Sequence, residues 1–350
     1  MVDWSSFLLD PVGNKTMLNS GQRSTTTPYD GPARPASMPP TRAKDLAPDL
    51  TCAEAARQAL QVPLDAIETL LPLAAARPQE DIEYVHQLRV ATRRAGAAMA
   101  VFKACLDPTA GRRARKALRR IRRAAAAARD CDVHAELFDT MLADADKDVR
   151  PALERLAETT RMARHEAQPD IIAAASRFEP DILAHIHTRL IETIDKPRKK
   201  DVPGKGRPKS LANLANRVIP PAAKAVRQEA GPPPWNAHRL HQVRIRTKRL
   251  RYICEIFQTC TSRDQHRSIK KQLIPLLDVL GEMNDTFNVM DRIESVRATI
   301  GDRDPCADSM ATLFVRYERT YDNEVDAAAR KLKAVMNTDL FELLESGRHG

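Results

Sequence analysis

Apolar residues recur every three or four positions along nearly the whole chain after residue 50. This period matches the turn of an α-helix, and the helix-favouring residues Ala, Leu, Arg and Glu dominate the same stretch. No segment shows the convincing two-residue alternation of a half-buried strand. The pattern therefore predicts an all-α protein. The expected helices cover residues 51–76, 80–105, 111–129, 131–147, 150–167, 170–194, 209–229, 236–259, 264–282, 286–299, 306–335 and 338–346.

Proline and glycine punctuate this pattern. Pro63 in the first expected helix, and Pro220 and Pro221 in helix 209–229, should kink or split those helices because proline has no N–H to donate. The stretch 196–208 is basic and broken by Gly and Pro, which is typical of a linker.

The first 50 residues differ from the rest. They contain seven prolines with many Ser, Thr and Gly, a composition that buries too little apolar surface to offset the entropy of ordering. We therefore expect residues 1–50 to be a disordered tail. Within it, Trp4, Phe7 and Leu8 have the spacing of a short helical docking motif, so segment 1–10 could recruit a protein partner; incidental apolar content is the more common explanation. If the docking hypothesis holds, deleting residues 1–50 should abolish recruitment and leave anion binding intact.

The clearest sequence signal is an internal repeat with an offset of 155 residues. "VHQLRVATRR" at 85–94 matches "LHQVRIRTKR" at 240–249, and the same offset relates Asp130 to Asp285. A chance match would not hold one offset and one charge type over so long a stretch. The repeat predicts two copies of one helical unit, at 51–195 and 209–350.

The repeated basic residues occupy one stripe on each helix. At 100° per residue, His86, Arg89 and Arg93 share a face that adjoins the apolar seam carrying Leu88 and Phe102. Such residues lie beside a groove between helices and are partly desolvated. Cations crowded at reduced dielectric repel one another, so a fold tolerates them when a polyanion neutralises them, or when acids from other helices pair with them.

Further basic residues follow each stripe. "RRARKALRRIRR", 112–123, has eight Lys/Arg in twelve residues, and Arg and Lys bind phosphate oxygens through charge-assisted hydrogen bonds. Part of this run could equally be a solvated basic face. Residues shared between the copies, with their close neighbours, make the candidate phosphate-binding set: His86, Arg89, Arg93, Arg112, Arg115, Lys116, Arg119, Arg161, Arg164, His241, Arg244, Lys248, Arg267, Lys270, Lys271, Arg316 and Arg319.

Composition supports an anionic partner. The formal net charge is +10 with only 4% aromatic residues, which suits phosphate better than stacked bases.

The six cysteines form no C-x-x-C pair, no run of 18 apolar residues predicts a membrane span, and the N-terminus lacks the pattern of a secretory signal. A cytoplasmic location is expected.

The two motifs resemble the CHAD family, which is named for its histidine and α-helical content. In each copy the motif histidine is followed 44 residues later by an aspartate, in "AARDCDV" and "LGEMNDTFNV". The resemblance implies two pseudo-symmetric four-helix bundles around a central basic channel that binds inorganic polyphosphate. It implies that the candidate set above binds polyphosphate, and it adds two channel residues of the second copy, Arg251 and Tyr252. It also implies location at polyphosphate granules, or fusion to a triphosphate-tunnel catalytic domain. The first copy departs from the pattern, with Ala95-Gly96-Ala97 where the second has Leu250-Arg251-Tyr252.

Catalysis is not expected. The triphosphate-tunnel domain needs an E-x-E-x-K strand, and the nearest stretch, "EDIEY" at 80–84, has the wrong spacing and a helical context. His185 and His187 do not share a helix face, so we expect no metal, and nothing indicates a cofactor. Asp130 and Asp285 should cap the following helix or, less favoured, position an Arg.

Two matters stay open at this point. The motif histidines His86 and His241 are expected to contact phosphate, with cationic neighbours disfavouring their protonation until phosphate binds. The main alternative function is nucleic-acid binding through the same basic surface and the 196–210 linker, whose "KGRPK" resembles a minor-groove arm.

Overall fold

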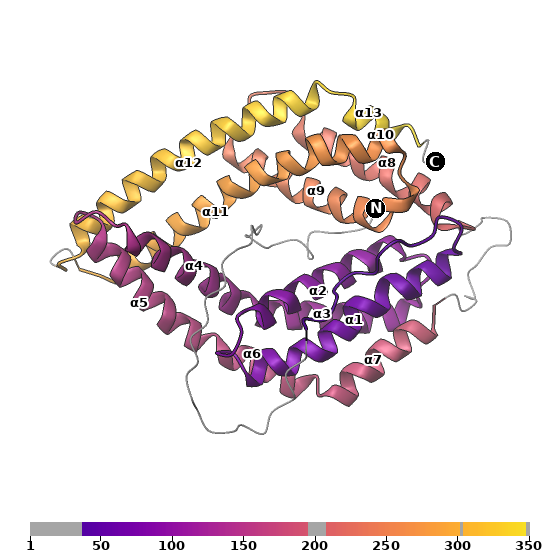
Figure 1. Cartoon of the computed structure of the whole chain (residues 1–350), viewed down its shortest axis with the longest axis horizontal. Coiled ribbons are helices and arrows are strands. Elements are labelled where there is room, and N and C mark those ends of the chain that lie inside the picture. The colour runs from indigo at the N-terminus through magenta and orange to yellow at the C-terminus, as the bar shows by residue number, and fades with distance from the viewer. Residues whose placement is uncertain (1–36, 195–207, 302–303, 348–350) are drawn as a thin grey trace.

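The computed structural model of the chain describes residues 37–194, 208–301 and 304–347 (Figure 1). All regular elements in these ranges are helices, apart from one isolated bridge between Thr51 and Ser210, so the all-α prediction is confirmed. The docking motif of segment 1–10 and nearly all of the 196–208 linker lie outside the described residues.

The first half contains seven helices that lie close to the predicted ranges. They are α1 (Cys52–Ala76), α2 (Glu83–Val101), α3 (Pro108–Ala124), α4 (Ala126–Ala143), α5 (Arg150–Glu166), α6 (Gln168–Arg177) and α7 (Pro180–Glu192). The predicted helix 170–194 is split into α6 and α7, because Pro180 begins a new helix. In contrast, α1 continues through Pro63 without splitting, and the Pro63 ring is buried in the core.

The second half has α8 (Leu211–Ala230), α9 (Ala237–Ile256), α10 (Arg263–Ser268), α11 (Ile274–Arg297), α12 (Ala307–Met336) and α13 (Leu340–Glu345). Short 3₁₀ and π segments, η2 (Gln258–Cys260) and η3 (Ile269–Leu273), flank α10. The predicted break near residue 283 is absent, because α11 runs on through it. Helix α8 likewise continues through Pro220 and Pro221.

Successive helices pack as hairpins, and two buried cores result. The main core joins both halves, with α1, α2 and α3 from the first and α8 and α9 from the second. The second core lies at the far end, where the α4–α5 hairpin meets the α11–α12 hairpin (Figure 1). Buried residues of both halves contribute to each core, so the cores do not separate the halves. The division into two separate bundles stays a prediction.

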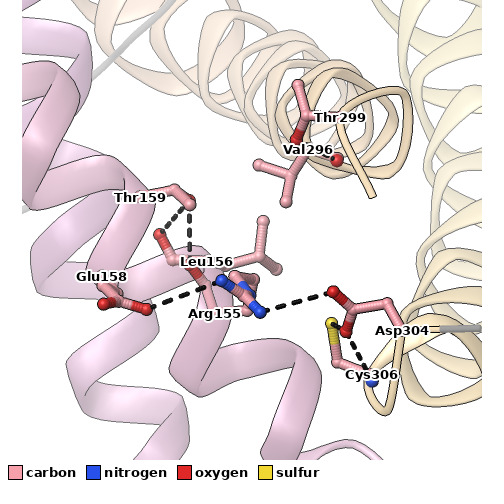
Figure 2. Close-up of polar contacts among 8 residues, drawn as sticks. All are labelled: Arg155, Leu156, Glu158, Thr159, Val296, Thr299, Asp304 and Cys306. Atoms are coloured by element: carbon pink, nitrogen blue, oxygen red, sulfur yellow. Dashed lines mark hydrogen bonds and ion pairs between the residues drawn. The ribbon is translucent and has the colours of Figure 1, made fainter. Parts of the chain in front are cut away.

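Polar contacts close the far end (Figure 2). Arg155 on α5 lies between Glu158 of its own helix and Asp304, with its Nη2 3.4 Å from Asp304 Oδ2. Asp304 also accepts hydrogen bonds from the backbone N–H and the thiol of Cys306, each at 3.0 Å. The start of α12 is thereby fastened to α5, which fixes the halves relative to each other.

Helix α1 is long and apolar enough to cross a membrane by length and composition alone. Its apolar residues, including Leu60, Ile67 and Leu70, are buried against α2, α6, α7 and α8. The protein core therefore already covers the face that a membrane would otherwise cover.

The predicted boundary of the disordered tail was wrong for the residues that the structure describes. Thr41 and Leu46 are buried, and the backbone oxygens of Pro48 and Leu50 accept hydrogen bonds from the start of α8. The proline-rich composition did not predict these contacts, because they are made with helices far away in the sequence.

Truncating Ile293, a fully buried residue of the second core, tests the shared packing. Ile293→Ala should lower the free energy of unfolding by about 2–5 kcal/mol, because it leaves a cavity between α11 and its neighbours from the other half. Urea denaturation would measure this. The matched control is Ile172→Ala, at a side chain that is 46% exposed, and equal midpoints for the two variants would contradict a shared core.

Candidate functional site

Helices α2 and α9 bring the two basic stripes together at the contact between the halves (Figure 1). Arg93 on α2 is close enough to lower the pKa of both Arg244 and Lys248 on α9. Arg89 and Arg244 occupy equivalent places and are almost fully buried, with 4% and 1% of their surfaces exposed. The structure therefore joins these four predicted site residues in one place.

Local sequence explains why these arginines are buried. Arg89 follows Leu88 and Arg244 follows Val243, and both apolar residues are fully buried in the seam of their helices. A side chain one position after a seam residue lies against the neighbouring helix and is buried there. A residue three or four positions later lies nearer the edge of the helix–helix contact.

Each buried arginine has one nearby aspartate. Arg89 Nη2 lies 3.9 Å from Asp130 Oδ1, and Asp285 is the acid that most strongly favours the charged form of Arg244. Burial raises the pKa of Asp130, and it raises the pKa of Asp285 to about 6. Both aspartates lie inside helices, α4 and α11, so the favoured capping prediction was wrong. Their nearness to Arg89 and Arg244 favours the alternative, that they position an arginine.

Helix α3 adds a cation that the candidate set had left out. Arg122 is 8% exposed, and its backbone oxygen accepts a hydrogen bond from Arg89 Nη1 at 3.4 Å. The signal was present in the sequence, because Arg122 follows Ile121 in the apolar seam of α3 and so lies at the core boundary. We define the cationic cluster as Arg89, Arg93, Arg122, Arg244 and Lys248.

Burial and mutual repulsion weaken the charged forms within the cluster. Burial, followed by the charges of neighbouring groups, lowers the pKa of Arg89 and of Arg122 to about 10 each. Burial, then Arg244 and Arg93, lowers the pKa of Lys248 to about 6, and its Nζ has no hydrogen-bond partner within the described part of the chain. Among the described neighbours that shift these pKa values, the carboxylates are Asp130 and Asp285, which leaves more cations than anions.

The two motif histidines flank the cluster, in surroundings that favour their neutral forms. Burial, then Arg129, lowers the pKa of His86 to about 4, and burial, then Arg244, lowers the pKa of His241. This confirms that the surroundings disfavour protonation, with burial as the larger cause. Arg129, buried at the side of His86, was missed because it stands outside the repeated pattern.

The basic run on α3 extends outward from the cluster. Arg119 contributes to the lowered pKa of Arg122, and Arg115 has a lowered pKa from burial and then from Arg112 and Arg119. Arg112 and Lys116 are exposed on the same helix. In the second half the matching residues are exposed on α10 and η3, and they are Arg267, Lys270 and Lys271.

Several other predicted site residues have carboxylate partners outside the cluster. Arg161 pairs with Asp139, Arg164 Nε lies 2.6 Å from Asp132 Oδ1, and Arg316 Nη1 lies 3.1 Å from Asp146 Oδ2. Arg319 is exposed on α12. Arg251 Nε is 2.9 Å from Glu255 Oε1. The pairing alternative therefore applies to these arginines at the periphery.

Tyr252 and Arg94 mark one side of the cluster. Tyr252 influences the pKa of Arg94, Arg122 and Arg244, so its hydroxyl lies among cations from three helices. On another side, a cavity of about 350 Å³ adjoins Asp285, with walls from α4, α11 and α12 that include His134, Tyr317 and Glu324.

No group of three or more His, Cys, Asp or Glu side chains that could hold a metal ion occurs in the ranges described. In the His-Ile-His stretch, His187 is buried with its Nδ1 2.6 Å from Glu68 Oε1, whereas His185 is exposed. These two histidines do not converge on one point.

Comparison with known proteins identifies this arrangement. The CHAD domain family matches residues 58–294, well over half of the chain and the whole cationic cluster. The chain belongs to the CHAD domain family. The match excludes residues 37–57, although the structure packs them onto the domain.

Two solved structures share the fold. The crystal structure of the CHAD domain from the plant Ricinus communis has a TM-score of 0.63 and 21% identity, covering 86% of this chain and 98% of that one. PptA from Streptomyces chartreusis has a TM-score of 0.58 and 16% identity, covering 83% and 100%. Among curated proteins, none matches. At these identities the structural similarity concerns the CHAD fold alone.

Replacing Lys248 by an uncharged side chain tests the repulsion. Its pKa falls from the usual 10.5 to about 6 in the fold, so the cost of burying it grows as pH falls from 10.5 towards 6. Lys248→Met should therefore stabilise the unbound protein, and more at pH 7 than at pH 10, by at least about 1 kcal/mol. Urea denaturation at both pH values measures it. Lys333→Met, on the exposed side of α12, is the control, and an advantage that does not change with pH would contradict the argument.

Proposed function

We propose that this CHAD protein binds inorganic polyphosphate at the cationic cluster without catalysing a reaction. The observation that carries the proposal is that Arg89, Arg93, Arg122, Arg244 and Lys248 converge from both halves, and that Asp130 and Asp285 are the carboxylates that act on their pKa values. Binding of polyphosphate is a general property of the family, which supports the proposal.

The energetics favour a polyanion over a single small anion. Repulsion among the cluster cations is relieved when phosphate oxygens lie between them, and Arg guanidinium groups can bind those oxygens in a bidentate manner. Each neutralised phosphate also releases counterions. By analogy with nucleic acid, ~8 phosphate contacts would give a log–log salt slope of roughly −7.

The absence of catalysis and the site of action in the cell are part of the proposal. Glu80–Tyr84, the nearest match to a catalytic triphosphate motif, forms the turn before α2 and its first residues, so its carboxylates do not line a strand. We propose that binding brings the protein to polyphosphate granules in the cytoplasm. Its distribution in cells, compared with a polyphosphate stain, would test this.

Removing the two equivalent arginines should weaken binding. We expect Arg89→Ala/Arg244→Ala to lower the affinity for defined polyphosphates at least tenfold, because two charge-assisted contacts are lost. Calorimetric titration measures it. Arg93→Ala, at a half-buried position, provides a second test.

The matched control is Arg189→Ala/Arg297→Ala, which removes two partly exposed arginines whose carboxylate partners are on their own helices. It should bind like the original protein. Retained affinity in both cluster variants would place the site elsewhere. If duplex DNA displaces polyphosphate at equal phosphate concentration, nucleic-acid binding becomes the better reading.

Binding should take up protons near pH 7. Lys248, with a pKa of about 6, and His86, with a pKa of about 4, are largely neutral in the unbound protein, and bound phosphate raises both values. Affinity should therefore increase as pH falls from 8 to 6. The apparent binding enthalpy should change with the ionisation enthalpy of the buffer, and less so in Lys248→Met. Identical enthalpies in all buffers would contradict proton uptake.

A further inference from the structure

Residues 41–50, which we call the strap, lie outside the family match and bind the first half of the domain. Thr41 is buried, and its hydroxyl accepts a hydrogen bond from Arg94 on α2. Leu46 is also buried and joins the main core. The strap is thus seated on the helix that carries Arg89 and Arg93.

The strap also binds the second half. The hydroxyl of Thr259, just after α9, donates to the backbone oxygen of Leu46. At the start of α8, the N–H of Ala212 donates to Pro48 O at 3.0 Å and the N–H of Leu211 donates to Leu50 O at 2.8 Å. These contacts fasten the strap across the junction of the halves.

This seating places Arg42 beside other cations. A small cavity lies under the strap, and its walls include Arg42, Arg94, Tyr252 and Glu255. Glu255 already pairs with Arg251. Its carboxylate therefore does not neutralise Arg42, Arg94 and Arg251 together. The cavity, about 30 Å³, holds only water-sized groups, so a phosphate would lie across its rim, where Arg42 is half exposed.

Tyr252 links this rim to the cationic cluster. It is one of the groups that act on Arg94 at the strap and on Arg122 and Arg244 in the cluster. Tyr252 lines the same cavity as Arg94 and Arg42, so basic side chains lie on both sides of it. A long, flexible phosphate polymer could contact both groups of cations, whereas a short one would bind within the cluster alone.

We propose that Arg42 is a further phosphate-binding residue, held by the strap at the end of a path that leaves the cationic cluster past Tyr252. The proposal rests on the polyphosphate-binding function proposed above. It adds that the strap extends the site to longer chains. It also corrects the expectation that deleting residues 1–50 leaves anion binding intact, because that deletion removes Arg42, whereas deleting residues 1–36 keeps it.

The test uses the full chain with Arg42→Ala and, as the control, Lys44→Ala, which removes an exposed charge from the same strap. Arg42→Ala should weaken binding of long-chain polyphosphate by about three- to tenfold and leave triphosphate binding unchanged. The log–log salt slope should fall in magnitude by about 0.7, the value for one single-strand phosphate contact. Arg42→Lys should restore the slope, which a purely structural role for the residue would not explain.

The outcomes separate the two proposals. If Arg42→Ala and Lys44→Ala both bind like the original chain while Arg93→Ala loses affinity, the strap proposal is overturned and the cluster remains the site. If Arg42→Ala weakens binding with an unchanged salt slope, Arg42 supports the fold and does not contact phosphate, which also overturns it. If Arg93→Ala has no effect either, the proposed function itself fails.

Discussion

Repulsion among buried cations is the constraint around which this structure is organised. Arg89 and Arg244 are buried as the hydrophobic core residues are, and Arg93, Arg122 and Lys248 stand close to them. Bringing like charges together at low dielectric costs free energy, which the burial of apolar seams on the same helices must offset. Burial is the largest cause of the lowered pKa of Lys248, and the charges of Arg244 and then Arg93 add to it.

The two aspartates explain how the buried arginines keep a defined position. Asp130 lies in the second turn of α4 and Asp285 in the middle of α11, the two helices whose outer ends build the second core. The packing of these helices in the second core therefore helps to set where each carboxylate lies. Arg93 and Arg122 lie beside the two buried arginines and add positive charge to the site.

The strap shows that the folded part of the chain extends beyond the residues that match the CHAD domain family. Residues 41–50 carry backbone carbonyls that satisfy the free N–H groups at the start of α8, and they cover the seam between α2 and α9. Helix starts leave such N–H groups without partners in their own helix, so the strap is held by hydrogen bonds that α8 needs in any case.

The sequence by itself determined the helical class, the positions of most helices and the pairing of His86, Arg89 and Arg93 with His241, Arg244 and Lys248, because helical period and charge type are local properties of the chain. Only the tertiary structure decided which cations meet. Arg161, Arg164 and Arg316 have the same repeat as the cluster residues yet find acids on neighbouring helices, and Arg122 joins the cluster because α3 turns it towards Arg89. The roles of Asp130, Asp285 and the strap could not be predicted from the sequence either. Each depends on contacts between segments far apart in the chain, and the hydrophobic period of a single helix carries no information about such contacts.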